Sequence, residues 1–315
     1  MGNIPSEKEV ISYFESLSNW GRWGKEDQLG TLNFITPEKT RNSLQLVEEG
    51  TTISMSRTIT NTPSPDAPMP PLHFMIESGD GWSSEDKKTS RKTQGAQDFI
   101  GMAFHGYSIT HVDSLSHFFH NGKMYNGWPA NLVSTNLGAT VESVEVASHG
   151  VITRGVLVDA PMILDVPWLG RGDGVLPEHI EEAEKQCNFE LEEGDVMLVR
   201  TGHLKRRNEE GPVDVTKVGG PACHAACLPL IQKSGLAMLG SDTGNDVNPP
   251  PYPSVPQPIH QIGITSMGLW ILDNADLEEI SQACMARNQW TFLLIISPLL
   301  IGNATGSPVN PLAMF

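Results

Sequence analysis

Four short apolar runs, separated by segments with helical character, most constrain what this chain can fold into. They are rich in Val, Ile, Leu and Met and cover residues 151–159, 195–202, 236–242 and 290–298. Runs of this length are typical of strands buried inside a sheet. Candidate helices lie between or beside them, at residues 177–186, 223–234 and 277–287. Alternating helices and strands with long loops predict a mixed sheet flanked by helices, rather than a doubly wound one.

The rest of the chain predicts one large domain of residues 1–315 with an N-terminal extension over about 1–50. A helix is expected at residues 6–18, and a second from residue 37 to about 49, because Thr36 and Pro37 form a favourable helix start. Further strands are expected at 51–60, 98–113 and 264–272. Residues 62–97 are rich in Pro and Ser and predict a long loop that serves as a lid or a subunit contact, with disorder at 83–94 as the alternative.

Composition excludes several classes of partner. The net charge of −16 argues against nucleic acid and against an anionic membrane surface, because both bind clusters of Lys and Arg. The N-terminus lacks the apolar centre of a signal peptide, and no apolar run approaches a membrane span, so a cytoplasmic protein is expected. The four cysteines, which form no Cys-x-x-Cys pair, are expected to be free buried thiols.

The most chemically specific stretch is residues 104–120, which holds four of the ten histidines and one aspartate. His111 and Asp113 are two residues apart and so project from one face of a strand, and His105 has the same parity. Imidazole and carboxylate suit zinc, manganese or iron, and a bound metal could acidify a water near neutral pH. His117 is then the candidate proton carrier. The alternative is that these histidines make ordinary hydrogen bonds.

Residues 110–113 followed by His117 resemble the core of His-x-Gly-Thr-His-x-Asp-x-x-x-His, the motif of the cyclase-like metal-dependent hydrolases, which include kynurenine formamidases and isatin hydrolases. The first histidine of that motif corresponds here to Tyr107. His105 is a candidate replacement, but at about 3.3 Å per residue it reaches the same metal only if the chain bulges or curls. Residues 154–159, 198–202 and 239–242 resemble core segments of the family in the same order, and residues 24–33 and 305–311 resemble its longer "putative cyclase" branch.

The resemblance also supplies the second half of the site. The family's second motif is a histidine followed about a dozen residues later by an acidic residue and Asn, which corresponds here to His260 and Asp273-Asn274. In kynurenine formamidases this histidine and acidic residue are metal ligands, and the acidic residue, a glutamate, bridges two metals. Asp273 is one methylene shorter, so the resemblance favours one metal, zinc or manganese, over two. The alternative for Asp273 is a cap on the following helix.

Together these observations predict a metal-dependent hydrolase of a small cyclic amide, lactone or N-acyl (formamide-type) compound. Aromatic side chains are the expected walls of the substrate pocket: Trp20, Trp23, Phe118 and Tyr125. Tyr107 could donate a hydrogen bond to a developing oxyanion or simply pack. A metal-dependent lyase or cyclase and a non-catalytic ligand-binding protein are the rival functions. The resemblance implies an α+β fold with a mixed sheet, and a homodimer or larger homo-oligomer.

Overall fold

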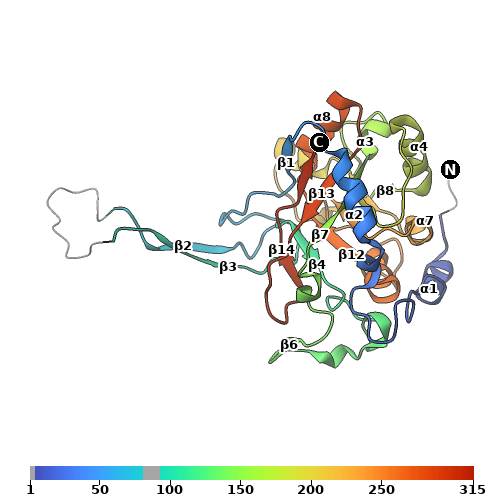
Figure 1. Cartoon of the computed structure of the whole chain (residues 1–315), viewed down its shortest axis with the longest axis horizontal. Coiled ribbons are helices and arrows are strands. Elements are labelled where there is room, and N and C mark those ends of the chain that lie inside the picture. Colours follow the sequence, from blue (N-terminus) through green and yellow to red (C-terminus); the bar gives the residue numbers. More distant parts are fainter. Residues whose placement is uncertain (1–3, 81–92) are drawn as a thin grey trace.

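The computed structural model of the chain describes residues 4–80 and 93–315. A nine-stranded mixed sheet forms its centre, with helices around it (Figure 1). In sheet order the strands are β1 (Thr52–Ser54), β15 (Leu312–Met314), β13 (Thr291–Ile296), β7 (Val151–Asp159), β9 (Val196–Arg200), β11 (Met238–Ser241), β12 (Trp270–Asp273), β4 (His111–Asp113) and β14 (Gly306–Pro308). Strands β7, β9, β11 and β12 are parallel, and the remaining pairs are antiparallel. The predicted α+β fold with a mixed sheet is confirmed.

The four apolar runs occupy the middle of this sheet, as predicted. Strand β7 is the longest, and Val156, Leu157 and Val158 on it are fully buried. Every residue of β9 and β11 is also buried. Parallel strands are covered by helices on both faces, so both faces must be apolar. This is why the runs that form β7, β9 and β11 lack the alternation of a half-exposed strand.

Four of the five expected helices begin within one residue of the prediction, the fifth begins at Leu228 instead of residue 223, and three helices were not expected. All eight α-helices of the described residues lie outside the sheet. They are α1 (Glu7–Ser16), α2 (Pro37–Ser43), α3 (Ala160–Ile163), α4 (Pro177–Cys187), α5 (His203–Glu210), α6 (Val215–Val218), α7 (Leu228–Ser234) and α8 (Glu278–Arg287). The Thr36 hydroxyl accepts a hydrogen bond from the Lys39 amide at 3.1 Å, which confirms the predicted start of α2. The helix ends at Ser43, earlier than expected, and a 3₁₀ turn (Leu44–Leu46) follows.

Short elements complete the body. A π-helix, η7 (Ile259–Met267), precedes β12. The 3₁₀ turns besides Leu44–Leu46 are Gly30–Phe34, Tyr125–Gly127, Ala130–Leu132, Val144–Ala147 and Ala225–Cys227. Two small ladders pair β8 (Gly174–Val175) with β10 (Ala222–Cys223) and β5 (Val133–Ser134) with β6 (Gly138–Ala139). All four cysteines are buried and free, and no helix within the described ranges is long and apolar enough to cross a membrane.

Three sequence predictions about strands were wrong. The strand expected at 98–113 is interrupted: β3 (Gln97–Gly101) ends, a loop of residues 102–110 turns, and only His111–Asp113 rejoin the main sheet as β4. The strand expected at 264–272 is mostly η7, because a continuous apolar run does not distinguish a buried helix from a buried strand. The strand expected at 51–60 is limited to β1, Thr52–Ser54.

The long loop expected at 62–97 instead contains a strand. Strand β2 (Leu72–Glu77) pairs with β3 as a two-stranded ribbon that stands clear of the body (Figure 1). We call these two strands the β2–β3 ribbon. The expected disorder at 83–94 falls almost entirely outside the described residues, because residues 81–92 are not described.

Buried Asp195 ties the start of α2 to the sheet. Its carboxylate accepts two hydrogen bonds from Arg154, at 2.9 and 2.7 Å, and lies 2.7 Å from Lys39 Nζ. We expect Asp195→Ala to lower the free energy of unfolding by about 3 kcal/mol, because it leaves two cations without their shared anion. The neighbouring Glu192→Ala, whose side chain is largely exposed, should cost less than about 1 kcal/mol. Urea denaturation of both variants checks this, and equal losses would contradict it.

Candidate metal centre

The pairing register of β4 with β12 places three side chains on one face of the sheet. His111 lies directly opposite Asp273, and Asp113 follows two residues along β4. Opposite residues in an antiparallel pair share a face, as do residues two apart on one strand. His111 Nε2 is 3.5 Å from Asp113 Oδ1 and 3.8 Å from Asp273 Oδ2. The spacing of His111 and Asp113 in the sequence therefore correctly predicted a shared face.

A backbone carbonyl sets the tautomer of His111. Its Nδ1 lies 2.8 Å from the Ile109 carbonyl oxygen, which can only accept a hydrogen bond. Nδ1 therefore carries a proton, and Nε2 is the ring nitrogen that faces Asp113 and Asp273. A hydrogen bond of this kind at one ring nitrogen orients histidines that bind a metal through the other.

His260 reaches the same place from η7, and Asp246 orients it. The Asp246 carboxylate accepts from His260 Nδ1 at 2.6 Å and from the Ile259 amide at 2.8 Å. It thus holds both the ring and the first turn of the helix. His260 Nε2 then lies 3.3 Å from Asp113 Oδ2 and 3.5 Å from Asp273 Oδ2. Sequence reasoning found His260 but missed Asp246, which lies 14 residues earlier with no recognisable spacing.

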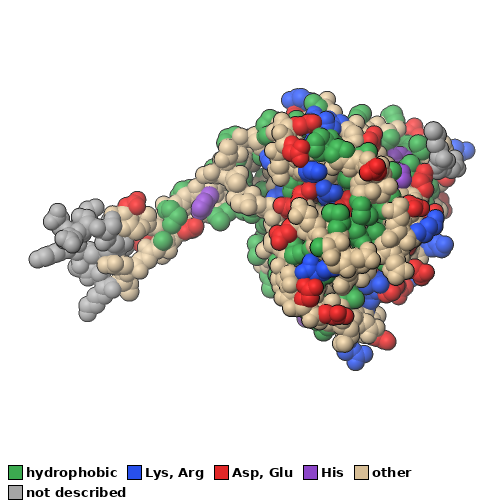
Figure 2. All heavy atoms as spheres, turned by 90° about the horizontal axis from the view of Figure 1, so that it is seen from above, with side chains coloured by type: hydrophobic (Ala, Val, Ile, Leu, Met, Phe, Trp, Pro, Cys, Tyr) green, Lys and Arg blue, Asp and Glu red, His purple; other side chains and the backbone are tan. Residues whose placement is uncertain are grey.

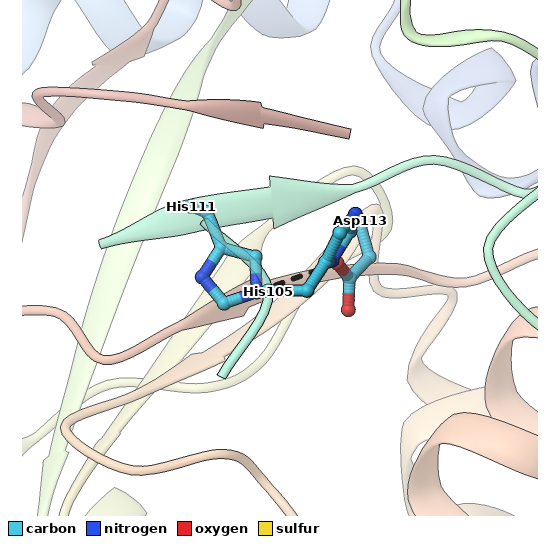
Figure 3. Close-up of side chains that lie close together, drawn as sticks. All are labelled: His105, His111 and Asp113. Atoms are coloured by element: carbon cyan, nitrogen blue, oxygen red, sulfur yellow. Dashed lines mark ion pairs between the residues drawn. The ribbon is translucent and has the colours of Figure 1, made fainter. Parts of the chain in front are cut away.

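His105 approaches Asp113 from the loop 102–110 rather than from a strand. Its Nδ1 is 2.9 Å from Asp113 Oδ1, and its Nε2 is 3.2 Å from Thr305 Oγ1 (Figure 3). The loop curls because the Asn274 amide donates to the carbonyls of Gly106 and Ile109, at 2.7 and 3.2 Å. The parity argument for His105 was therefore wrong, since the chain turns between it and His111, but the required curl is present.

His117 and His105 form the open side of the cluster. Their rings stack with centroids 3.9 Å apart, and their side chains are 23% and 29% exposed, whereas the side chains of His111, Asp113, His260 and Asp273 are at most 7% exposed. His117 Nε2 is 3.8 Å from Asp113 Oδ1. Phe118 lies beside this opening, with its ring 5.0 Å from the rings of His117 and His260. Among the residues of the cluster, His105 and His117 are therefore the most accessible to a ligand.

Asp113 is the electrostatic centre of the cluster. Burial by itself raises the pKa of this carboxyl, but the surrounding histidines, His117 foremost, hold it well below its usual range. Burial lowers the pKa of His117 to about 4, so this ring is neutral near pH 7. Burial also lowers the pKa of His260, but the Asp273, Asp113 and Asp246 carboxylates together raise it well above its usual range. The site therefore favours a positive charge among buried carboxylates.

The donor set fits a metal ion. Ligand atoms of His105, His111 and Asp113 lie within 4.8 Å of one another, and so do those of Asp113, His260 and Asp273. Both carboxylate oxygens of Asp113 are buried and receive no hydrogen bond, although ring nitrogens lie 2.9 to 3.5 Å away. The nitrogens and oxygens thus point toward a common space rather than at one another. Nitrogen and oxygen donors in this arrangement could hold zinc or manganese.

Of the four other aromatic residues predicted for the site, Tyr107 lies close to the cluster and the other three do not contact its histidines. Their proposed roles stay predictions. Tyr107 lies close to Gly244 and Asp273, and burial raises the pKa of its hydroxyl. Tyr125 is fully buried, with its hydroxyl 3.2 Å from Asp27 Oδ2. Trp20 donates to the Thr265 carbonyl, and Trp23 packs edge-on against Phe34. Within residues 4–80 and 93–315, no hydrogen bond or ring contact joins Trp20, Trp23 or Tyr125 to the clustered histidines.

Solved structures share this fold. A structure described as a novel cyclase is 28% identical, with a TM-score of 0.87 over 95% of this chain and 100% of that one. Isatin hydrolase A from Labrenzia aggregata, bound to benzyl benzoate, is 21% identical, with a TM-score of 0.58 over 84% and 93%. An isatin hydrolase bound to the product analogue thioisatinate is 15% identical, with a TM-score of 0.59 over 89% and 98%.

Sequence comparison gives the family. No curated protein is similar enough to this chain to count as a match. The family model described as "Putative cyclase" matches residues 52–245, which is more than half of the chain and includes β4 with the loop that carries His105. This match and the fold of the novel cyclase confirm the resemblance drawn from His111, Asp113 and His117. The chain belongs to the putative cyclase family.

Proposed function

We propose that this protein is a metal-dependent hydrolase that opens a small cyclic amide or lactone, or cleaves an N-acyl compound of the formamide type. One observation carries the proposal: both buried oxygens of Asp113 lack hydrogen bonds, while ring nitrogens of three histidines lie 2.9 to 3.5 Å from them. An unpaired buried carboxylate is costly unless a cation compensates it. The similarity of the fold to isatin hydrolases supports the hydrolase class.

The proposed ligands are His111, Asp113, Asp273 and His260, with His105 on the open side. Nitrogen and carboxylate oxygen together suit zinc or manganese. Asp113 belongs to both groups of candidate ligands, so one ion among them would contact members of each. We propose one ion rather than two, because Tyr107 stands where the family motif has its first histidine and burial keeps its phenol protonated.

A bound divalent ion would supply an acidic water and a Lewis acid for the carbonyl oxygen of the substrate. The side chains around it have separate tasks. His117 is neutral near pH 7, half-buried and beside the open side, so it can accept the proton of the attacking water and pass it to the leaving nitrogen or oxygen. Phe118, with its ring 5.0 Å from the rings of both His117 and His260, is the proposed wall for a planar substrate.

Metal content is the first prediction. The purified protein should hold about one equivalent of zinc or manganese, and His111→Ala should lose it because Nε2 of this ring is a ligand. His149→Ala, which removes an exposed histidine, should keep the metal. Elemental analysis after dialysis checks this, with circular dichroism to confirm that each variant is folded. A folded parent that takes up no metal at neutral pH would overturn the proposal.

The orienting role of Asp246 is the second prediction. We expect Asp246→Asn to weaken metal binding about 10- to 100-fold, because the carboxylate no longer fixes the ring of His260. Asp165→Asn is the matched control, since Asp165 is exposed and its positive φ of 53° is one that asparagine tolerates. Competition with a chelator measures both affinities. An unchanged affinity in Asp246→Asn would show that His260 is oriented without it.

Proton transfer by His117 is the third prediction. His117→Ala should keep its metal but lose about 10²- to 10⁴-fold in kcat, because only the proton relay is removed. The control is His120→Ala, which removes a nearby ring that stacks on Phe14 instead. Cyclic amides, lactones and N-formyl aromatics are the substrates to screen, and mass spectrometry of the products separates hydrolysis, which adds one water, from a lyase or cyclase reaction. Full activity in His117→Ala would show that another group transfers the proton.

A further inference from the structure

Arg57 is a buried cation with which no carboxylate pairs directly. Only 8% of the residue is exposed. Its guanidinium donates to two main-chain carbonyls, that of Tyr107 at 2.9 Å and that of Asp242, and its Nε is buried without a hydrogen-bond partner. Across the described ranges, 4–80 and 93–315, no ion pair joins Arg57 to an acidic side chain. Because buried arginines are almost always paired, this one calls for a compensating anion.

A cavity of about 470 Å³ lies against Arg57. Its volume is within the range of small-molecule sites. Pro71 lines the cavity and directly precedes β2, so the cavity lies at the base of the β2–β3 ribbon, where the ribbon leaves the body (Figures 1 and 2). Leu204, Arg207 and Asn208 of α5 form another side. The lining also offers several hydroxyl groups, those of Thr58, Thr60, Thr62, Ser64 and Ser108.

The other charges at the cavity are already matched. Arg207 donates through two nitrogens to the Asp66 carboxylate. Asp276, the one acidic residue of the described lining, accepts from the Glu278 amide in the first turn of α8, whose positive end offsets its charge. Burial lowers the pKa of Arg57 to about 10, so its guanidinium is still charged near pH 7. The cavity therefore has one positive charge without a direct counterion.

Asp242 is the alternative counterion, because its carboxylate acts more strongly on Arg57 than the other acidic groups do. It contributes its main-chain carbonyl rather than its carboxylate to the guanidinium. The carboxylate instead accepts from the amide and the hydroxyl of Thr201, both at 2.8 Å. Two of the five N–H donors of the guanidinium are thus used, both by neutral carbonyls, and the others can serve a ligand.

We propose that this cavity binds a small organic monocarboxylate, with its carboxylate group on Arg57 and the rest of the molecule among the hydroxyl groups. Hydrogen bonds between guanidinium and carboxylate are among the strongest in proteins, and the planar fork fits the two oxygens. One positive charge without a counterion matches one negative charge, and a chain with a net charge of −16 disfavours a dianion such as phosphate. Apolar Ile59, Ile109 and Leu204 also line the cavity, which suits a ligand with an apolar part.

The cavity is distinct from the candidate metal centre but borders the same loop. In the part of the chain that the structure describes, none of the clustered histidines and carboxylates lines it. Ser108 and Ile109 do, and the Ile109 carbonyl accepts from Nδ1 of His111. A carboxylate in the cavity would thus contact the loop that orients a proposed metal ligand. The metal and the carboxylate should then change each other's affinity by the same factor.

Calorimetric titration of the full-length protein with benzoate tests the proposal. Benzoate should bind saturably, and benzamide, which has the same shape without the charge, should bind about tenfold more weakly or worse, because it loses hydrogen bonds to a charged group. Inorganic phosphate should not displace benzoate at equal concentration. Benzoate should bind His111→Ala as well, because Arg57 does not need the metal. That variant separates a failure of this proposal from a failure of the proposed hydrolase, and it excludes benzoate bound to the metal itself.

Variants of the lining locate the bound carboxylate. Arg57→Met should weaken benzoate binding about tenfold or more. Asn208→Trp, which fills part of the cavity from an exposed position and leaves Arg57 in place, should do the same. Glu209→Trp is the matched control, because it adds the same ring to an exposed position of α5 that does not line the cavity.

Circular dichroism shows whether each variant is folded. Since Arg57 also holds the Tyr107 carbonyl, Asn208→Trp decides the question if Arg57→Met does not fold. A folded parent that does not bind benzoate would overturn the proposal and leave Arg57 a purely structural role. Benzoate binding that survives Asn208→Trp, equal binding of benzamide, or displacement by phosphate would also overturn it.

Discussion

The antiparallel pairing of β4 with β12 is the constraint on which the candidate metal centre depends. It sets His111 opposite Asp273 and leaves Asp113 on the same face, two residues further along. A slip of β4 by one residue would turn His111 and Asp113 to the face opposite Asp273. Strand β14 pairs with the other side of β4, so the register of this three-residue strand is fixed from both sides. Short as it is, β4 cannot shift without breaking two ladders.

Much of this could be predicted from local pattern. The buried strands follow from apolar runs, and the shared face of His111 and Asp113 follows from a spacing of two. Both inferences concern neighbours in the chain, where geometry is set by backbone repeats. The start of α2 is equally local, because the Thr36 side chain caps an amide three residues away.

What could not be predicted depends on partners far apart in the sequence. His105 reaches Asp113 because the Asn274 amide bends the loop 102–110, and no pattern within the loop reveals that hydrogen bond. Asp246 could not be predicted for the same reason. Its role depends on its hydrogen bonds to Ile259 and His260 at the start of η7, which is distant in the sequence. The sequence also does not distinguish an aromatic residue of the core from one that lines a pocket. Tyr125, beside turns and glycines, is predicted to be a pocket wall, yet its side chain is fully buried. Only the tertiary neighbours of such a residue decide between the two.

The place of β4 in the sheet also orders events during synthesis. Strand β4 lies near the first third of the chain, but its two neighbours, β12 and β14, come from the last 46 residues of the sequence printed here. Thr110 and Asn274, which hydrogen-bond next to the site, are 164 positions apart. Contacts between residues this far apart in the sequence form late in folding, because closing the long loop costs entropy before the contact contributes any stability. A growing chain therefore carries His111 and Asp113 on an incomplete sheet until β12 and β14 are made, and the centre can assemble only once those two strands have left the ribosome.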